Sequence, residues 1–326
     1  MKHISILIPK GAILGSLEGT RQLFTQVNEF MKVRGAPPLF KVQLVGLTKE
    51  TPIAGGCFTA HADLLLDEVK KTDLIIIPAV DGDIVNALEM NKDFIPWITK
   101  QYKNGSEVAS LCMGAFILAS TGLLEGKKCA THWMAANQFR KMFPGVNLVT
   151  EQIITDEQGI YSSGGAFSYM NLILYLIEKY AGREIAVLSA KVFAIEIDRH
   201  SQSPFIMFQG QKEHSDEPIK DAQTFIENNF MEKITVDELA SRLALGRRNL
   251  ERRFKKATSN TVVEYIQRVK IEAAKKSFET TRKNINEIMY DVGYSDTKAF
   301  RTVFRKITGL SPIEYRSKYN KDVIAV

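Results

Sequence analysis

The hydrophobic pattern of roughly the first 180 residues alternates between two periods. Short β-branched runs of strand length are followed by segments in which apolar residues recur every three or four positions. This alternation is typical of a parallel sheet covered by helices on both faces, which predicts a three-layer α/β domain over residues 1–182. Strands are predicted at Ile4–Pro9, Phe40–Leu47, Asp73–Pro78, Glu107–Leu111, Asn147–Thr155 and Gly159–Ser163, and helices at Leu17–Met31, Phe94–Tyr102, Gly114–Ser120 and Ala166–Tyr180.

The pattern changes after residue 182. Helical periodicity continues over Gly182–Arg199, and turn-forming and charged residues then gather near Gly210–Pro218. We therefore predict a helix and a flexible linker over residues 183–218. After Pro218 no strand pattern remains, which predicts an all-α domain over residues 219–326.

The all-α segment contains an internal repeat. RRFKKATSNTVVEY (252–265) aligns with TVFRKITGLSPIEY (302–315) at an offset of 50 residues. Each copy opens with a capping box, TVDE (235–238) or NINE (284–287), followed by a short helix, a tight turn and a second helix. This order predicts two helix-turn-helix motifs.

The second helix of each copy combines a narrow apolar stripe with long polar side chains. Leu250 and Phe254 form the stripe in the first copy, and Phe300 and Phe304 form it in the second. Arginine and lysine suit guanine edges and phosphates, and asparagine suits adenine. Solvated basic residues on a plain helical hairpin are the alternative. The candidate DNA-binding residues are Arg247, Arg248, Asn249, Arg252, Arg253, Thr297, Lys298, Arg301, Thr302 and Arg305.

Charge separates the two halves of the chain. Residues 219–326 hold 22 Lys+Arg and 14 Asp+Glu, a net charge of +8, which leaves −2 for residues 1–218 and gives the total of +6. A basic module on a neutral one indicates a nucleic-acid partner, although solvated lysine-rich helices would give the same balance. Hydrophobic residues make up 45% of the chain, which excludes a disordered class, and no apolar run approaches the roughly 20 residues of a membrane span. We expect a cytoplasmic protein without a membrane partner.

The helical repeat is similar to a known family. The segment INEIMYDVGYSDTKAFRTVFRKITGLSPIEYR (285–316) resembles the signature of the AraC/XylS family of bacterial transcription regulators, and the resemblance extends over roughly Ile219–Tyr319. It implies that both second helices bind promoter or operator DNA.

A candidate nucleophile lies in the first domain. In EVASLCMGAFILAS (107–120) a predicted strand leads directly into Cys112 and then a helix, with the small residue Gly114 two positions on. A sharp strand-to-helix turn of this kind can present a thiol, and we expect the helix N-terminus to lower the thiol pKa. The chain's three cysteines predict no disulfide framework, and we predict no metal or cofactor. The pair Cys129-x-x-His132 fits a buried thiol beside a structural histidine better than a metal site.

The motifs SLCMGA (110–115), GLLEGKKCATHW (122–133) and YSSGGA (161–166) together resemble the PfpI-like, class I glutamine-amidotransferase-like superfamily. The resemblance implies a flavodoxin-like fold and an acid near the cysteine. Ser16 stands where that acid is expected, which leaves Glu18 as the candidate. His132 is either a base or a core histidine bonded to a backbone carbonyl. The candidate effector-pocket or vestigial catalytic residues are Cys112, Met113, His132, Glu18, Gly164 and Gly165.

Two functions remain open from the sequence. The leading hypothesis is a sequence-specific, DNA-binding transcriptional regulator that is not an enzyme. Its first domain would sense an unknown small-molecule effector, form a homodimer, or both. The regulator could also contact RNA polymerase. The alternative is a cysteine-dependent amidase or hydratase with an accessory helical domain. Cys112 could thus be catalytic, redox-sensing or only structural.

Overall fold

A computed structural model describes residues 1–197, 199 and 201–320. The chain divides into two compact units, Met1–Gln202 and Ser203–Val326. Residues 198 and 200 of the predicted helix-and-linker segment, and residues 321–326 of the predicted all-α domain, lie outside the described residues.

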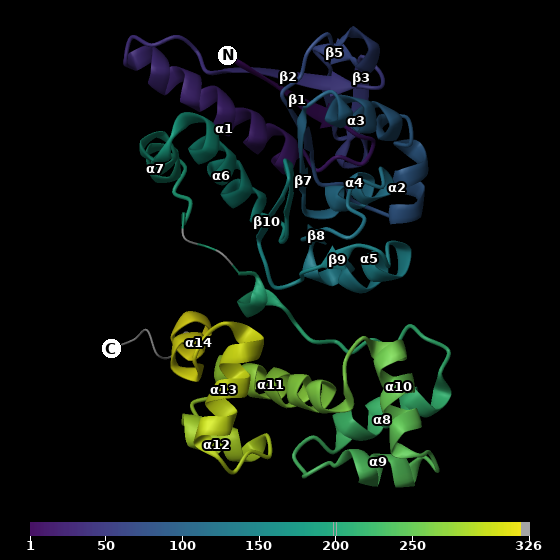
Figure 1. The fold of residues 1–326 in the computed structure, drawn as a ribbon. Helices are drawn as coiled ribbons and strands as arrows, with labels where there is room; N and C mark the ends of the chain where they lie inside the picture. The colour runs from purple at the N-terminus through teal and green to yellow at the C-terminus, as the bar shows by residue number, and fades with distance from the viewer. Residues whose placement is uncertain (198, 200, 321–326) are drawn as a thin grey trace. The chain divides into compact units, whose positions relative to one another are not determined.

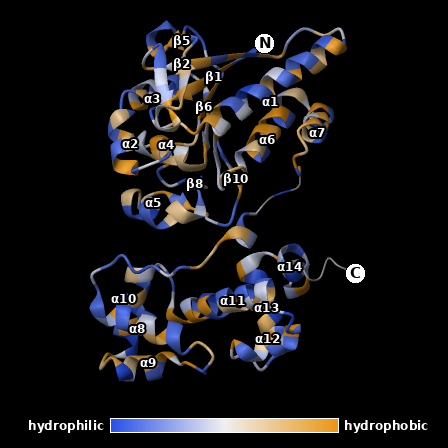
Figure 2. Ribbon diagram, turned by 180° about the vertical axis from the view of Figure 1, so that it is seen from behind, coloured by the Kyte–Doolittle hydropathy of each residue, from blue (hydrophilic) through white to orange (hydrophobic). Residues whose placement is uncertain are grey.

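The first unit is built on a seven-stranded sheet of order β10-β11-β7-β6-β1-β2-β5. Every neighbouring pair is parallel except β10 and β11. All four residues of β6 are buried, as its continuous apolar run predicted, and Figure 2 shows the central strands mainly in hydrophobic colours. The strands are β1 (Lys2–Ile8), β2 (Phe40–Gly46), β3 (Glu50–Ile53), β4 (Phe58–His61), β5 (Leu64–Leu65), β6 (Leu74–Ile77), β7 (Glu107–Leu111), β8 (Lys128–Cys129), β9 (Asn147–Leu148), β10 (Ile154–Glu157) and β11 (Ile160–Ser163).

Helices cover both faces of this sheet (Figure 1). One hydrophobic core joins α1, α6 and α7 to the sheet, and a second core joins α2, α3, α4 and α5 to its other face. The predicted three-layer, flavodoxin-like architecture is therefore confirmed. The helices are α1 (Leu14–Val33), α2 (Ile84–Met90), α3 (Phe94–Lys103), α4 (Ala115–Ser120), α5 (Ala136–Met142), α6 (Tyr169–Ala181) and α7 (Arg183–Val192), with short 3-10 turns that include η3 (Cys112–Gly114) and η4 (Trp133–Ala135).

Two predicted elements of this unit are wrong in extent. The single strand expected at Asn147–Thr155 is two strands, because β9 pairs with β8 in a separate small sheet and β10 joins the main sheet. The helix expected through Arg199 ends at Val192. Ala194 has a left-handed φ of 53°, and the Ile195 N–H bonds back to the Ala190 carbonyl at 2.9 Å, which closes the helix.

The second unit is entirely helical. Its longest helix, α11, has 19 residues and connects the group α8–α10 to the group α12–α14 (Figure 1). Within the described residues of the chain, no helix is both long and apolar enough to cross a membrane. The helices are α8 (Glu217–Asn228), α9 (Val236–Arg242), α10 (Arg247–Thr258), α11 (Val262–Thr280), α12 (Ile285–Asp291), α13 (Thr297–Thr308) and α14 (Pro312–Tyr319), preceded by the 3-10 turn η5 (Ser203–Phe205).

Each repeat copy has its own hydrophobic core. Leu250 and Phe254 of α10 are fully buried in one core, and Phe300 and Phe304 of α13 are fully buried in the other, as their spacing predicted. Helix α11 contributes its first half to the first core and its second half to the second. It therefore fixes the two copies to each other.

The stretch expected to be a flexible linker is bonded to the helical unit. The backbone carbonyl of Gln211 accepts a hydrogen bond from the Gln223 side chain, and the side-chain oxygen of Gln211 accepts one from the Asn260 side chain. Phe208, just upstream, packs edge-on against Tyr265 with ring centroids 5.0 Å apart. Residues 203–218 thus belong to the packing of the second unit.

Candidate functional site

Both helix-turn-helix turns have the same local geometry. Ala244 and Gly293 lie at the equivalent turn position with left-handed φ values of 52° and 72°. In the first copy the Leu245 N–H bonds to the Ala240 carbonyl at 2.9 Å, and the corresponding bond in the second copy measures 3.0 Å. The glycine suits this conformation, whereas the alanine occupies it at a cost of about 1 kcal/mol. The predicted pair of motifs is therefore present.

The short first helices begin at the predicted caps. The Thr235 hydroxyl accepts the Glu238 N–H at 3.2 Å, and the Asn284 side chain accepts the Glu287 N–H at 3.0 Å. In the second copy the Glu287 carboxylate also accepts the Asn284 N–H, at 2.6 Å. These caps set where α9 and α12 start.

The polar residues predicted to read DNA lie on the outer faces of α10 and α13. Eight of them are exposed, and Arg253 and Thr297 are half-buried. No ion pair within the described part of the chain involves Arg248, Arg252, Lys298, Arg301 or Arg305. Their charged groups are therefore not held in ion pairs and are available to an anion.

Two of the predicted arginines are engaged inside the protein. Arg253 makes a two-pronged ion pair with Asp216, at 3.0 and 2.5 Å, which joins α10 to the start of α8. Arg247 pairs with Asp237 at 2.9 Å and with Glu251 at 3.4 Å. Arg253 thus has a packing contact that its sequence position did not reveal, because its partner lies 37 residues away.

A buried lysine, whose contacts its place in the sequence does not reveal, lies between the two copies. The ammonium of Lys270 on α11 donates to the carbonyls of Val292, Glu232 and Gly293 at 3.0, 3.2 and 3.3 Å. It thereby bonds both the turn of the second motif and the loop that precedes α9. Burial lowers the pKa of Lys270. A lysine within a basic helix gives no local signal of such a contact.

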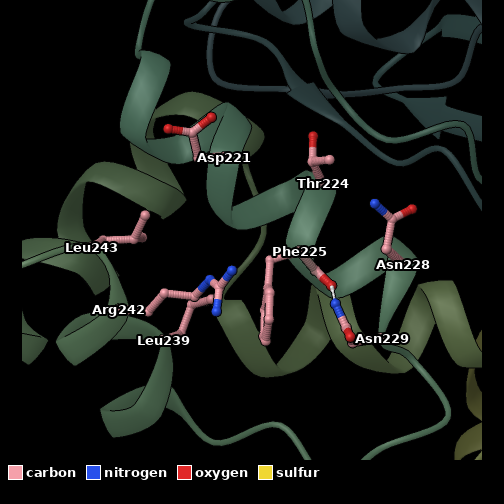
Figure 3. A pocket seen from close by; sticks show the side chains of 8 residues that line it. All are labelled: Asp221, Thr224, Phe225, Asn228, Asn229, Leu239, Arg242 and Leu243. Atoms are coloured by element: carbon pink, nitrogen blue, oxygen red, sulfur yellow. Dashed lines mark hydrogen bonds between the residues drawn. The ribbon is translucent and has the colours of Figure 1, made fainter.

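A groove of about 430 Å³ lies between α8 and α9 (Figure 3). The guanidinium of Arg242 lies over the Phe225 ring, 4.3 Å from its centroid, and Asn229 donates to the Phe225 carbonyl at 2.8 Å. Asp221 also lines the groove. The groove includes none of the predicted DNA-reading residues.

In the first unit Cys112 lies on the predicted elbow. It follows β7 directly and has a φ of 52°, a conformation that non-glycine residues seldom adopt. Gly114 explains how the turn fits, since a Cβ there would come within 2.5 Å of the Pro78 carbonyl oxygen and 2.7 Å of the Ile77 oxygen. The small residue is therefore required by the close approach of two backbone segments.

The expected low pKa of the Cys112 thiol is wrong. The thiol is 4% exposed, and burial raises its pKa to about 11, with the Met113 N–H offsetting only part of that effect. Cys129 is also buried, and its pKa rises to about 12.

The other members of the hypothetical catalytic set are engaged elsewhere. His132 Nδ1 accepts the Met134 N–H at 3.2 Å, so this histidine caps η4 and bonds a backbone N–H rather than the expected carbonyl. Burial lowers the pKa of His132. Glu18 on α1 makes two 2.7 Å bonds to Arg21. Among the described residues no hydrogen bond joins Cys112 to either side chain.

The structure does bring Cys112 close to the glycine pair. Ser163 of β11 pairs with Leu111 of β7 in parallel register, so Cys112 and Gly164 follow at the same edge of the sheet. Ligands of open α/β sheets bind beyond this carboxyl edge. Gly165 has a φ of 72°, which allows the chain to turn there. Met113 follows Cys112 in η3 and is half-buried.

Comparison with known proteins matches both units. A helix-turn-helix domain model matches residues 239–318, and a DJ-1/PfpI family model matches residues 33–179. The regulator GbdR of Pseudomonas aeruginosa is 27% identical over 248 residues, 73% of this chain, and CdhR of the same organism is 24% identical over 266 residues, 81% of this chain. The matches span 66% of GbdR, just under two thirds of its length, and 78% of CdhR.

A solved structure shares the fold of part of the chain. An AraC family transcriptional regulator from Pseudomonas putida superposes with a TM-score of 0.51 and 14% identity, over 59% of this chain and 100% of that one. Both curated relatives carry the name of HTH-type transcriptional regulators. The chain thus carries a DJ-1/PfpI domain followed by an AraC-type helix-turn-helix domain, and it is similar over most of its length to named HTH-type transcriptional regulators.

Proposed function

We propose that this protein is a sequence-specific, DNA-binding transcriptional regulator in which residues 1–202 sense a small-molecule effector and form a homodimer. One observation carries the DNA-binding part. Two helix-turn-helix motifs each present an exposed second helix with arginines outside any ion pair of the described residues, Arg252 in one and Arg301 and Arg305 in the other. Such helices insert into the major groove.

The length of α11 supports binding along one face of the duplex. A 19-residue helix is about 28 Å long. Successive major grooves on one face of DNA are about 34 Å apart. A rigid helix of this length, with one recognition helix packed near each end, suits two adjacent grooves.

The first unit supplies the proposed sensing and pairing functions. Its carboxyl sheet edge gathers Cys112, Gly164 and Gly165, as ligand-binding edges of this fold class do. Dimerisation through this unit would make the second DNA contact effectively intramolecular and so raise affinity. Light scattering of the full chain at micromolar concentration tests this point, and a monomer would contradict it.

A DNA titration at several salt concentrations tests the DNA-binding proposal. Genome-wide mapping of bound DNA supplies the site, and fluorescence anisotropy then measures the affinity of the full chain. We expect Arg252→Gln and Arg305→Gln each to reduce the salt slope of log K by about 0.9. Arg183→Gln on α7, an exposed arginine paired with Glu178, is the matched control. Unchanged affinity in both variants would overturn the assignment.

RNA polymerase is a second partner in this proposal. The groove between α8 and α9 offers it a concave surface that the predicted DNA-reading residues do not use. Asp221→Lys should then lower transcription from the mapped promoter without changing DNA affinity. Loss of both together would assign the defect to folding or DNA binding instead.

Catalysis by the first unit is not part of the proposal. A working thiol hydrolase needs a thiolate, a base and an orienting group within mutual reach. Here burial raises the Cys112 pKa to about 11, His132 caps a turn, and Glu18 is bonded to Arg21.

A further inference from the structure

The last residue of the first unit turns its side chain back into that unit. Gln202 is 1% exposed, and its Nε2 donates to the backbone carbonyls of Thr131 at 3.0 Å and Gln152 at 3.3 Å. Its backbone N–H donates to the Glu151 carbonyl at 2.9 Å. The side-chain amide is therefore held by two acceptors that belong to distant parts of the chain.

A glycine makes room for this amide. At Gly164 a Cβ would lie 2.2 Å from Gln202 Nε2 and 2.9 Å from the Thr131 oxygen. The Thr131 hydroxyl also donates to the Cys112 carbonyl at 3.0 Å, which puts the amide beside the elbow at the carboxyl edge of the sheet. We use the name amide site for the Thr131 and Gln152 carbonyls together with Gly164.

The amide of Gln202 is only half satisfied in this site. Among the described residues its Oε1 has no hydrogen-bond partner, although it is buried. Buried polar atoms are nearly always paired, so an amide that leaves its oxygen unpaired is an incomplete occupant of this site.

We propose that the amide site binds a small molecule with a primary carboxamide group, and that Gln202 occupies the site as an internal substitute. The N–H groups of the ligand replace those of Gln202 on the Thr131 and Gln152 carbonyls. The carbonyl of a free ligand, unlike that of the tethered glutamine, is not fixed where its oxygen stays unpaired.

Because Gln202 lies at the junction of the two units, replacing its side chain by a ligand would affect that junction. Ser203, the next residue, begins the helical unit. A ligand that displaces Gln202 therefore detaches the junction from the first unit and changes the constraint on the DNA-binding unit. This inference rests on the proposed sensing function, but its tests measure ligand binding and junction exposure without DNA.

The first test compares small probes on the full chain. Ligand-detected NMR measures binding of acetamide, of acetate, which has the same size without N–H donors, and of methylammonium. We expect acetamide to bind Gln202→Ala at least tenfold more tightly than the wild type, because the internal competitor is gone. Equal acetamide affinity in both proteins would overturn the proposal, and so would preferred binding of acetate or methylammonium to Gln202→Ala.

The second test measures the junction. Trypsin cleavage after Arg199 should be about tenfold faster in Gln202→Ala than in the wild type, with Gln152→Ala as the control because only its backbone carbonyl contributes. Gly164→Ala, which expels the amide from the opposite side, should give the same acceleration if Gln202→Ala fails to fold. Unchanged cleavage in the folded variants would overturn the coupling.

Discussion

Iodoacetamide should modify Cys57 well before Cys112. Cys57 is exposed, whereas Cys112 and Cys129 are buried. Elbow cysteines at a helix N-terminus are normally expected to be the reactive ones. In this chain the order is predicted to be reversed, because burial rather than the helix controls ionisation of the elbow thiol.

The size of the effect follows from the raised pKa. With a pKa of about 11, about 0.1% of Cys112 is thiolate at pH 8, whereas an ordinary thiol with a pKa near 8.5 is about one quarter ionised. The low thiolate fraction alone should therefore make alkylation of Cys112 slower than that of an ordinary thiol by roughly two orders of magnitude. Its 4% exposure should slow it further. Cys129, with a pKa of about 12, should be slower still.

Mass spectrometry of tryptic peptides after timed labelling at pH 8 gives the three rates separately. Cys57→Ser removes the fast site, so any remaining labelling of the folded protein reports the buried pair. The same reaction in urea is the positive control, since all three thiols should then react at similar rates. Labelling of Cys112 in the folded protein as fast as Cys57 would refute the reasoning and restore a reactive elbow.

Three further predictions concern stability. Gly114→Ala should destabilise the first unit by about 1–3 kcal/mol in urea denaturation, because its methyl would meet two backbone carbonyls; an unchanged midpoint would refute the close approach. Lys270→Met should cost about 1–3 kcal/mol by leaving carbonyls unpaired, whereas Lys270→Arg should cost less, and equal losses would argue against the bonds. The pKa values of Cys112 and Cys129 are raised in the folded state, so their neutral thiols stabilise the fold at pH values below the unfolded thiol pKa of about 8.5–9. This contribution should disappear as the pH rises toward 11–12. Cys112→Ala should therefore flatten the loss of stability at alkaline pH, and an unaltered loss would contradict the raised pKa.

Elements defined by a local pattern could be predicted from the sequence. Strand β7 begins and ends at the residues that its apolar run indicated, Glu107 and Leu111. The left-handed turn at Gly293 and the buried stripe of α13 followed from residue type and spacing in the same way. In each case the information lies within about ten consecutive residues.

Features that depend on distant partners could not be predicted. Residues 149–153 resemble a strand, but Gln152 forms an isolated bridge with Ser201, and the strand is interrupted there. The buried positions of Lys270 and Gln202 likewise arise from backbone carbonyls far along the chain. At Cys112 the elbow was predicted correctly and the pKa was not, because desolvation depends on tertiary packing.

The packing of residues 203–218 decides where the DNA-binding unit can be cut from the rest of the chain. A fragment that starts at residue 219, where the helical pattern begins, would uncover the ring of Tyr265 and remove the Ile206 carbonyl that accepts from the buried Lys275 ammonium at 2.6 Å. A fragment that starts at Ser203 keeps both contacts. The piece that could be exchanged intact between sensor domains, in the laboratory or in evolution, therefore begins at Ser203, 16 residues before residue 219.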